Sequence, residues 1–445
     1  MANSTTIATA AELAALPKPQ NASVQPSFGR GYVIYAVGLM TLVNVLNYMD
    51  RQLMAILLEP IKRDFGLSDS EAGLLTGLAF SLLYTALALP AARLADRHSR
   101  RLLLSIAVAT WSLATGLCGV ASSFSVLLIA RLGVGVGEAG VLPTMHSMIS
   151  DMLPPRRRAI AMSALGVGAT TGAMIGVGLG GWVAQNHGWR TAFYAAMFPG
   201  LLISLVVFLT LRNPPRGFSD GVQHDGPAPK LGEAVGALLR RPAYRNIIIG
   251  IALGAVGMMG SAAWSGPFYM RVHGLTPAEV GAWFTFAHGI SGFAGVLLGG
   301  ALADWLHKYD DRAHVWVVSL SLGMAGVLSA VTYSVADARL SLIMYCLTAA
   351  FMAMWMGPLM AAQQGLSGVR YRAIGSATQM IGFNLIGTAG GPLLIGALSD
   401  ALAPRYGIEA LRYAMLLVLP FFFIGLLFML MALRTMRADM ADAAR

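Results

Sequence analysis

Charged side chains are scarce in this 445-residue chain, where Asp, Glu, Lys and Arg make up 12% of the residues and hydrophobic residues make up 56%. An ordinary soluble domain carries roughly a quarter charged residues. The shortage therefore excludes an ordinary soluble domain and indicates that most of the chain faces lipid. Glycine (51) and methionine (25) are abundant, which is typical of helices that pack closely and move against one another.

Cysteine is also scarce, since the chain has only two. Cys118 and Cys346 lie inside apolar stretches and lack ligand spacing, so we expect neither a disulfide framework nor a metal site. The motifs His-Glu-x-x-His and Gly-x-Ser-x-Gly are missing, which argues against a membrane-embedded enzyme. The sequence also lacks a sizeable soluble domain, which argues against a sensor or receptor, and we expect no cofactor.

The basic residues predict topology rather than nucleic-acid binding. The formal net charge is +10, but the arginines and lysines stand in short clusters between apolar runs. These clusters gather at 93–101, 156–158 and 212–245, in the even-numbered loops, so both termini are predicted to be cytoplasmic. Residues 1–30 have neither a basic start nor a continuous apolar core, so we expect a tail rather than a signal peptide.

Apolar runs long enough to cross a bilayer as helices, about 20 residues each, occur twelve times. They predict an all-α membrane protein with transmembrane helices over 31–57, 70–92, 101–121, 124–150, 159–184, 190–211, 244–270, 277–302, 314–335, 339–365, 373–399 and 410–433. A polar stretch rich in Pro and Gly follows the sixth run. We therefore expect a flexible cytoplasmic tail over 1–30, a six-helix bundle over 31–211, a cytoplasmic linker over 212–243, a second six-helix bundle over 244–434 and a cytoplasmic tail over 435–445.

The later part of the linker, KLGEAVGALLRR, has helical spacing. Its apolar side chains would share one face and lie on the membrane surface as an interfacial helix: Leu231, Val235, Leu238 and Leu239. An ordinary solvated helix fits the same spacing equally well.

Two short segments occur twice at matching places. The first pair is Ala92-Arg-Leu-Ala-Asp96 after run two and Gly300-Ala-Leu-Ala-Asp304 after run eight. The second pair is Arg158-Ala-Ile-Ala before run five and Arg372-Ala-Ile-Gly before run eleven. Such repeated segments indicate that the two helix bundles are copies of one internal repeat.

With this repeat the sequence resembles the major facilitator superfamily over about residues 30–435. That family has a Gly-x-x-x-Asp-Arg-x-Gly-Arg-Arg loop after its second helix, and here Ala92 and Ser99 replace the two glycines. The resemblance implies a gating role for the retained charges and their counterparts: Asp96, Arg97, Arg100, Arg101, Arg158 and Asp304. A solvated loop that only sets topology is the alternative.

Three further motifs resemble the Spinster group of lipid-handling transporters. They are Asn44-x-x-Asn47-Tyr48-Met-Asp50-Arg51, Arg131-Leu-Gly-Val-Gly-Val-Gly137-Glu138-Ala and Pro154-x-Arg156-Arg-Arg158-Ala. The short tails and the Ala- and Gly-rich composition look bacterial, which implies the inner membrane. This resemblance implies transport of molecules like sphingosine-1-phosphate or lysophospholipids, and we expect a monomer.

Polar residues of the first run form one stripe. Asn44, Asn47, Tyr48 and Arg51 follow the i, i+3, i+4, i+7 pattern, and Asp50 adjoins them. A charge at membrane depth costs a few kcal/mol or more unless it is paired or hydrated, so these residues predict a functional site. In the alternative, they lie near the helix end and only tie loops together.

Run four supplies two more charges, Arg131 and Glu138. They are seven residues apart, or roughly 10 Å along a helix axis, so each needs a partner on another helix. We predict pairing of Asp50 with Arg131 and of Arg51 with Glu138. Asp50 and Glu138 would then couple transport to protons, and a released arginine, with Arg131 favoured, would hold an anionic headgroup.

Run four also matches the dinucleotide pattern Gly-x-Gly-x-x-Gly at Gly135, Gly137 and Gly140. No strand precedes the match, so close helix packing explains these glycines better. Gly168, Gly172, Gly176 and Gly180 predict a similar seam in run five.

The second half is nearly free of membrane charge and offers aromatic and amide side chains instead. We predict that an amphipathic substrate places its tail against Trp264, Phe268, Trp355 and Asn384 and its headgroup near Arg51 and Arg131. Ordinary packing is the alternative for each aromatic residue. The predicted function is thus a proton-coupled secondary transporter of a lipid-like substrate, and the alternative is a proton-linked permease or exporter of small organic anions or drugs.

Overall fold

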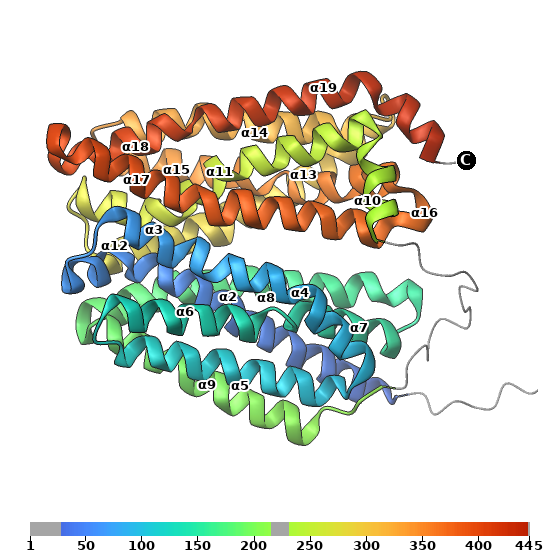
Figure 1. Ribbon diagram of the computed structural model, residues 1–445, viewed down its shortest axis with the longest axis horizontal. Helices are drawn as coiled ribbons and strands as arrows, with labels where there is room; N and C mark the ends of the chain where they lie inside the picture. Colours follow the sequence, from blue (N-terminus) through green and yellow to red (C-terminus); the bar gives the residue numbers. More distant parts are fainter. Residues whose placement is uncertain (1–27, 215–230, 444–445) are drawn as a thin grey trace, which may run out of the picture.

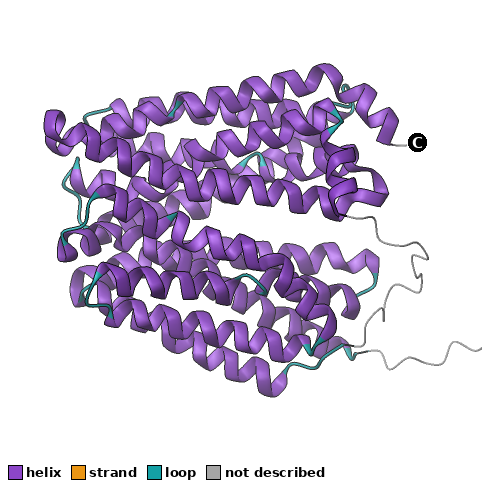
Figure 2. Ribbon diagram, in the orientation of Figure 1, coloured by secondary structure: helices purple, strands orange, loops and turns teal. Residues whose placement is uncertain are grey.

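The computed structural model describes residues 28–214 and 231–443, and every regular element in this part is helical (Figure 2). The helices form two groups that lie side by side (Figure 1). The first half contains α2 (Arg30–Phe65), α3 (Asp69–Thr76), α4 (Leu78–Arg97), α5 (Arg100–Val120), α6 (Phe124–Glu138), α7 (Val141–Met152), α8 (Pro155–His187) and α9 (Trp189–Thr210).

The second half contains more broken helices than the first. Its elements are α10 (Leu231–Leu239), α11 (Pro242–Arg271), α12 (Pro277–Phe286), η1 (Ala287–Ser291), α13 (Gly292–His307), α14 (Ala313–Ser334), α15 (Ala338–Ala353), α16 (Met356–Gly382), η2 (Phe383–Thr388), α17 (Ala389–Tyr406), η3 (Gly407–Glu409), α18 (Ala410–Val418) and α19 (Pro420–Ala443). Both η1 and η2 are π-helical turns. Such turns widen the helix locally and often mark functional places.

Eleven segments of the described chain are long and apolar enough to cross a membrane. The last, Ile374–Asp442, has 69 residues and contains the final predicted run, 410–433, and all but the first residue of the run before it, 373–399. A glycine with positive φ, Gly407 (φ 55°), ends the helix α17 between these two runs. The predicted tail 435–445 is helical as far as Ala443, whereas most of the predicted tail 1–30 and the middle of the linker lie outside the described residues.

The molecule has two ends, which we name by the linker. The linker end holds the start of α2, the end of α9 and α10, and the far end holds the end of α2, the start of α3 and the end of α11 (Figure 1). At the linker end α10 packs against α16 and α11. Ala234 and Leu238 are buried while Leu239 is exposed, so the buried face differs from the predicted apolar face.

Two capping boxes recur at the far end. Ser68 caps α3 together with Glu71, and Thr276 caps α12 together with Glu279. Each box follows a glycine with positive φ, Gly66 (64°) or Gly274 (69°), a conformation that side chains rarely adopt. The sequence Gly-Leu-Ser/Thr-x-x-Glu therefore marks the same turn in both halves, a third internal repeat.

Glycines bring α8 against α2. A Cβ atom at Gly172 would lie 2.1 Å from the Val45 carbonyl oxygen, and one at Gly176 would lie 2.5 Å from the Met49 oxygen. The predicted glycine seam is therefore confirmed as a close approach of two helices inside the first half.

Candidate functional site

The four predicted charges meet in the middle of the first half. Arg51 Nε on α2 donates to Glu138 Oε2 on α6 at 2.6 Å. Asp50 Oδ2 lies 3.6 Å from Arg131 Nη1, and Asp50 Oδ1 accepts a 2.7 Å hydrogen bond from the Thr115 hydroxyl on α5. Both predicted pairings are thus confirmed as contacts between different helices.

The four side chains differ in exposure. Those of Asp50 and Arg131 are each 3% exposed and that of Glu138 is fully buried, whereas Arg51 is 23% exposed. The Arg51 guanidinium also lies over three rings, 4.7 Å from the centroids of Phe80 and Tyr84 and 5.3 Å from that of Tyr48. In this conformation the arginine open to an incoming anion is thus Arg51, whereas the sequence favoured Arg131.

Glycines of α6 explain how this helix reaches the site. A Cβ atom at Gly137 would lie 2.6 Å from the Trp111 backbone nitrogen, and one at Gly135 would lie 2.7 Å from the Phe80 carbonyl oxygen. The glycines that match a dinucleotide pattern therefore allow α6 to pack closely on α4 and α5, as predicted.

The two asparagines of the stripe do not face open space. Asn44 is 2% exposed and Asn47 is 1% exposed, and Asn44 Nδ2 donates to the Leu165 carbonyl oxygen of α8 at 2.7 Å. Both asparagines are therefore buried in this conformation, and Asn44 is tied to α8, so their contact with substrate stays a prediction.

The aromatic residues predicted for the substrate tail divide into two kinds. Trp264 and Phe268 are fully buried, and Trp264 Nε1 donates to the Pro392 oxygen of α17 at 2.9 Å. Both therefore pack inside the second half, which corrects their assignment to substrate. Trp355 and Asn384 are half-buried and keep an accessible face, although Asn384 Nδ2 donates to the Met380 oxygen at 3.0 Å.

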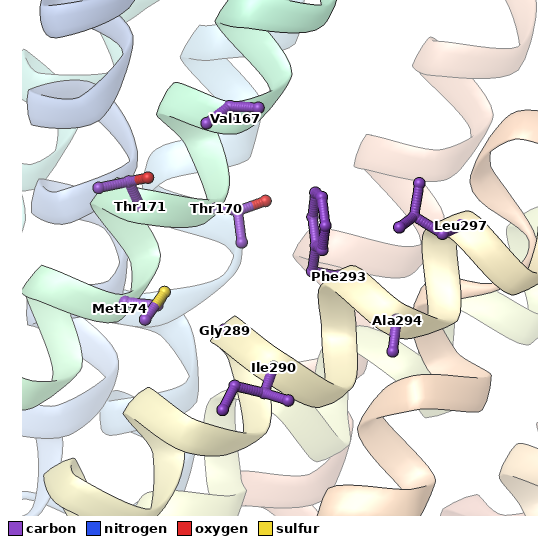
Figure 3. A pocket seen from close by; sticks show the side chains of 9 residues that line it. All are labelled: Val167, Thr170, Thr171, Met174, Gly289, Ile290, Phe293, Ala294 and Leu297. Atoms are coloured by element: carbon purple, nitrogen blue, oxygen red, sulfur yellow. The ribbon is translucent and has the colours of Figure 1, made fainter.

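An apolar pocket of about 440 Å³ lies where α8 of the first half meets η1 and α13 of the second half (Figure 3). Phe293 and Leu297 extend from α13 on one side, and Thr170 and Met174 extend from α8 on the other. The remaining lining residues are Val167, Thr171, Gly289, Ile290 and Ala294. The pocket is a place between the halves where an apolar group can fit.

Comparison with known proteins now decides the family. The model of the Major Facilitator Superfamily matches residues 40–392. The chain belongs to this superfamily. It is therefore a membrane transporter and not an enzyme, as its sequence predicted.

Relatives within the superfamily include both an efflux pump and Spinster proteins. An MFS-type efflux pump of Mycolicibacterium smegmatis is 32% identical over 422 residues, which cover 92% of this chain and 95% of the pump. Protein spinster homolog 1 of Xenopus tropicalis is 29% identical over 406 residues, which cover 84% of this chain and 76% of that protein.

A solved structure of similar fold is that of a bacterial homolog of the human lysosomal transporter Spinster, in an inward-facing and unoccupied conformation. It matches with a TM-score of 0.84 at 27% identity and covers 93% of this chain and 99% of that one. The predicted resemblance to Spinster is confirmed.

The predicted gating residues of this superfamily member lie at the linker end. Arg100 is buried and ties α5 to its neighbours, because its guanidinium donates to the Ser147 hydroxyl at 2.8 Å, to Asp151 and to the Pro214 oxygen at 2.6 Å. Asp304 is exposed. Arg158 Nε donates to the Leu153 oxygen at 2.9 Å, the Arg101 guanidinium lies 5.4 Å from the Phe208 ring centre, and the side chains of Asp96 and Arg97 lie outside the described part.

A second charged cluster, at the far end, joins the two halves. Arg271 of α11 donates to both oxygens of Asp69, at 2.7 and 2.9 Å, and to Glu59 Oε2 at 2.8 Å. Ser399 of α17 also donates to Asp69 at 2.6 Å, and Lys62 pairs with Asp69. We call Glu59, Lys62, Asp69, Arg271, Ser399 and Asp400 the far-end cluster.

Asp400 completes the cluster by capping a helix of the other half. Its carboxylate accepts hydrogen bonds from the backbone N–H groups of Asp69 (2.8 Å) and Ser70 (2.7 Å). Both residues belong to the first turn of α3. Sequence reasoning missed this cluster, because its members resemble solvated loop charges. The repeated capping boxes were the available signal that the start of α3 is a defined structural place.

Proposed function

We propose that this protein is a proton-coupled secondary transporter that moves an amphipathic, lipid-like substrate with an anionic headgroup by alternating access. The observation that supports it most is the arrangement of the four charges, in which two buried ion pairs leave only Arg51 partly exposed. Substrates of the proposed class resemble sphingosine-1-phosphate or lysophospholipids.

The geometry suggests how proton and substrate are linked. Arg51 donates its hydrogen bond to Glu138, so a proton on Glu138 would remove the charge that holds the guanidinium. An anionic headgroup can then accept from Arg51, whose planar donors match phosphate and carboxylate groups. Asp50 lies beside Arg131 at 3.6 Å, an ion pair without a hydrogen bond, and we propose that both carboxylates take part in coupling.

The apolar part of the substrate has room in the pocket between the two halves. The pocket beside α8 and α13 is lined by aliphatic and aromatic side chains and two threonines. Trp355 and Asn384 remain candidate contacts, because both keep accessible surface in the second half.

The transport cycle follows from the two halves. We propose twelve crossings, because the final stretch of 69 residues is far longer than the about 20 residues that one crossing needs. Bundles 31–211 and 244–434 would rock about the central charges in a bacterial inner membrane, as a monomer with both termini cytoplasmic. The far-end cluster then closes the outside, which agrees with the similarity to an inward-facing structure.

Uptake into liposomes tests the coupling. A fluorescent lysophosphatidic acid should accumulate when a pH gradient is imposed on liposomes that contain the wild-type protein. Asp50→Asn and Glu138→Gln should abolish this response, whereas Asp311→Asn, an exposed carboxyl outside the site, should keep it. Undiminished pH-driven uptake in both site variants would overturn the proposal.

Export of small drugs is the second candidate function, and the efflux pump that is 32% identical favours it. Ethidium competes with lysophosphatidic acid for transport only if the site accepts small cations as well. Transport of ethidium without any transport of the lysolipid would replace the first candidate by the second.

A further inference from the structure

Unpartnered polar atoms concentrate around the central charges. Among the described residues, sixteen buried side-chain nitrogen and oxygen atoms have no hydrogen-bond partner in the protein, and eight of them belong to six residues of this group. The eight atoms are Asn44 Oδ1, Asn47 Oδ1 and Nδ2, Asp50 Oδ2, Arg51 Nη2, Arg131 Nε and Nη1, and Glu138 Oε1.

Asn47 is the most telling member. Both polar atoms of its amide are unpartnered among the described residues, although the residue is 1% exposed. Asn44 Oδ1 lies one helical turn before it on α2, and Asp50 Oδ2 lies one turn after it. A row of orphan atoms therefore follows α2 for about 9 Å along its axis and turns roughly 120° around the helix from Asn44 to Asp50.

An amide buried in this way is costly unless something satisfies it. Each buried polar group without a partner costs about 1–3 kcal/mol, so the row would lose several kcal/mol if it were dry. Internal water is the usual solution, because one molecule serves two to four polar groups. A row of donors and acceptors spaced by one turn suits a chain of such molecules.

We propose that Asn44 and Asn47 hold internal water in a chamber within the first half, and that this water carries the proton to Asp50 from the linker end. The asparagines then serve the proton rather than the substrate. Substrate meets the exposed part of the Arg51 side chain, and the proton arrives past the two buried asparagines of α2. This inference rests on the proposed proton coupling at Asp50.

The surroundings of Asp50 leave this route open. On α5 it meets Thr115, which donates to Oδ1, and the thiol of Cys118; on α6 it meets Arg131 and, farther off, Glu138. Arg51 is the charged neighbour on its own helix. Thr115 occupies one oxygen, and Oδ2 stands 3.6 Å from Arg131, so Oδ2 is the atom available to a proton from water.

Infrared spectroscopy of the purified protein tests the chamber without a substrate. After a rapid drop in pH, the wild type should show a carboxylic C=O band that disappears in Asp50→Asn, and internal O–H bands that shift in H₂¹⁸O. Asn47→Leu has a similar volume and no polar atoms, so it should lose the shifted O–H bands and slow the protonation of Asp50 by at least about tenfold.

Two controls separate the roles. Asn47→Ser keeps a hydroxyl and space for water, so it should restore most of the rate. Ser329→Ala removes an unpartnered buried hydroxyl from α14 of the second half and should leave rate and bands unchanged. If Asn47→Leu does not fold, Asn47→Val replaces it with a smaller apolar side chain.

The outcomes are distinct. Wild-type bands and rate in Asn47→Leu would overturn the chamber while leaving the coupling at Asp50 intact. A wild-type protein whose Asp50 never takes up a proton would overturn the proposed coupling and the route with it. Loss of the bands together with slow protonation, restored by serine, supports the chamber.

Discussion

Two seams close the far end of the molecule, and they are built alike but charged differently. In each, a glycine touches the first turn of a capped helix and a polar residue four positions later caps that turn. Gly396 and Asp400 of α17 do so for α3, and Gly181 and Gln185 of α8 do so for α12. The α3–α17 seam thus uses a carboxylate, and the α8–α12 seam uses a neutral amide.

The difference extends to the surrounding residues. Arg271 and Ser399 surround Asp69 in the α3–α17 seam, whereas Pro277 takes the place of Asp69 in the α8–α12 seam. Shape is therefore repeated while charge is not. Ion pairs join the α3–α17 seam, whereas a neutral amide joins the α8–α12 seam, from which α8 continues toward the apolar pocket.

Arg271→Gln should have the largest effect on the closure of the far end. It leaves Asp69 and Glu59 buried without their shared cation, which costs about 3 kcal/mol and shifts the ratio of closed to open far ends roughly a hundredfold toward open. Pulsed dipolar EPR between spin labels at the exposed far-end residues Thr191 and Arg339 measures this ratio. Arg63→Gln is the control, since Arg63 is exposed and pairs only with Glu59 in the described part. Equal distance distributions in both variants would show that the ion pairs of Arg271 have no role.

Gly396→Ala and Gly181→Ala test whether shape is shared. The new Cβ atoms would lie 2.2 Å from the Asp69 oxygen and 2.3 Å from the Pro277 oxygen, so each seam must separate. Both variants should favour the open far end by about 2 kcal/mol, roughly thirtyfold, on the same label pair. A large effect at one seam only would mean that the two seams do not close together. Gly300→Ala, where open space surrounds the Cβ atom, is the control.

Asp400→Asn removes charge and keeps the shape of the cap. The amide oxygen can still accept from one N–H group, but the attraction of the carboxylate for the helix N-terminus is lost. We expect the closed far end to lose about 1 kcal/mol, roughly fivefold in the closed-to-open ratio. The two backbone N–H groups and the Ser70 hydroxyl that donate to Asp400 are all uncharged, so high salt should reproduce only the part of this change that comes from the helix N-terminus. A ratio equal to that of the wild type would show that the charge of the cap is irrelevant.

The two central ion pairs could be predicted because their residues lie deep within membrane-spanning runs. Asp50 and Arg131 stand in long apolar runs, where a charge must find a partner, and only other helices could supply one. Family and helical class followed from equally strong signals, the length of the runs and the repeated motifs. The far-end cluster gave no such signal, since Asp69 and Arg271 lie at helix ends where charges are ordinarily solvated.

Exposure could not be predicted from residue type. Trp264 and Trp355 both look suited to a substrate tail, yet the first packs on Pro392 and the second keeps an open face. The rotation of a helix about its axis decides whether a side chain is buried or accessible. The pattern of apolar residues does not reveal this rotation in a membrane protein, because the lipid and the protein core accept the same side chains. Asn47 shows the converse, since a polar residue in a conspicuous stripe is buried.

Gln185→Glu is the smallest change and the most direct attempt to make the two seams alike. It places a carboxylate at the start of α12, where the Gln185 oxygen accepts the Ala278 N–H at 3.1 Å. A negative charge stabilises a helix N-terminus, but Glu279 already supplies one in this turn, so the gain is limited to about 0.5 kcal/mol. The EPR label pair should then show roughly a twofold shift toward the closed far end, and Gln185→Ala should shift it the other way. If Gln185→Glu instead opens the far end, repulsion from Glu279 exceeds the attraction of the helix terminus, and the α8–α12 seam is neutral because this turn tolerates only one carboxylate.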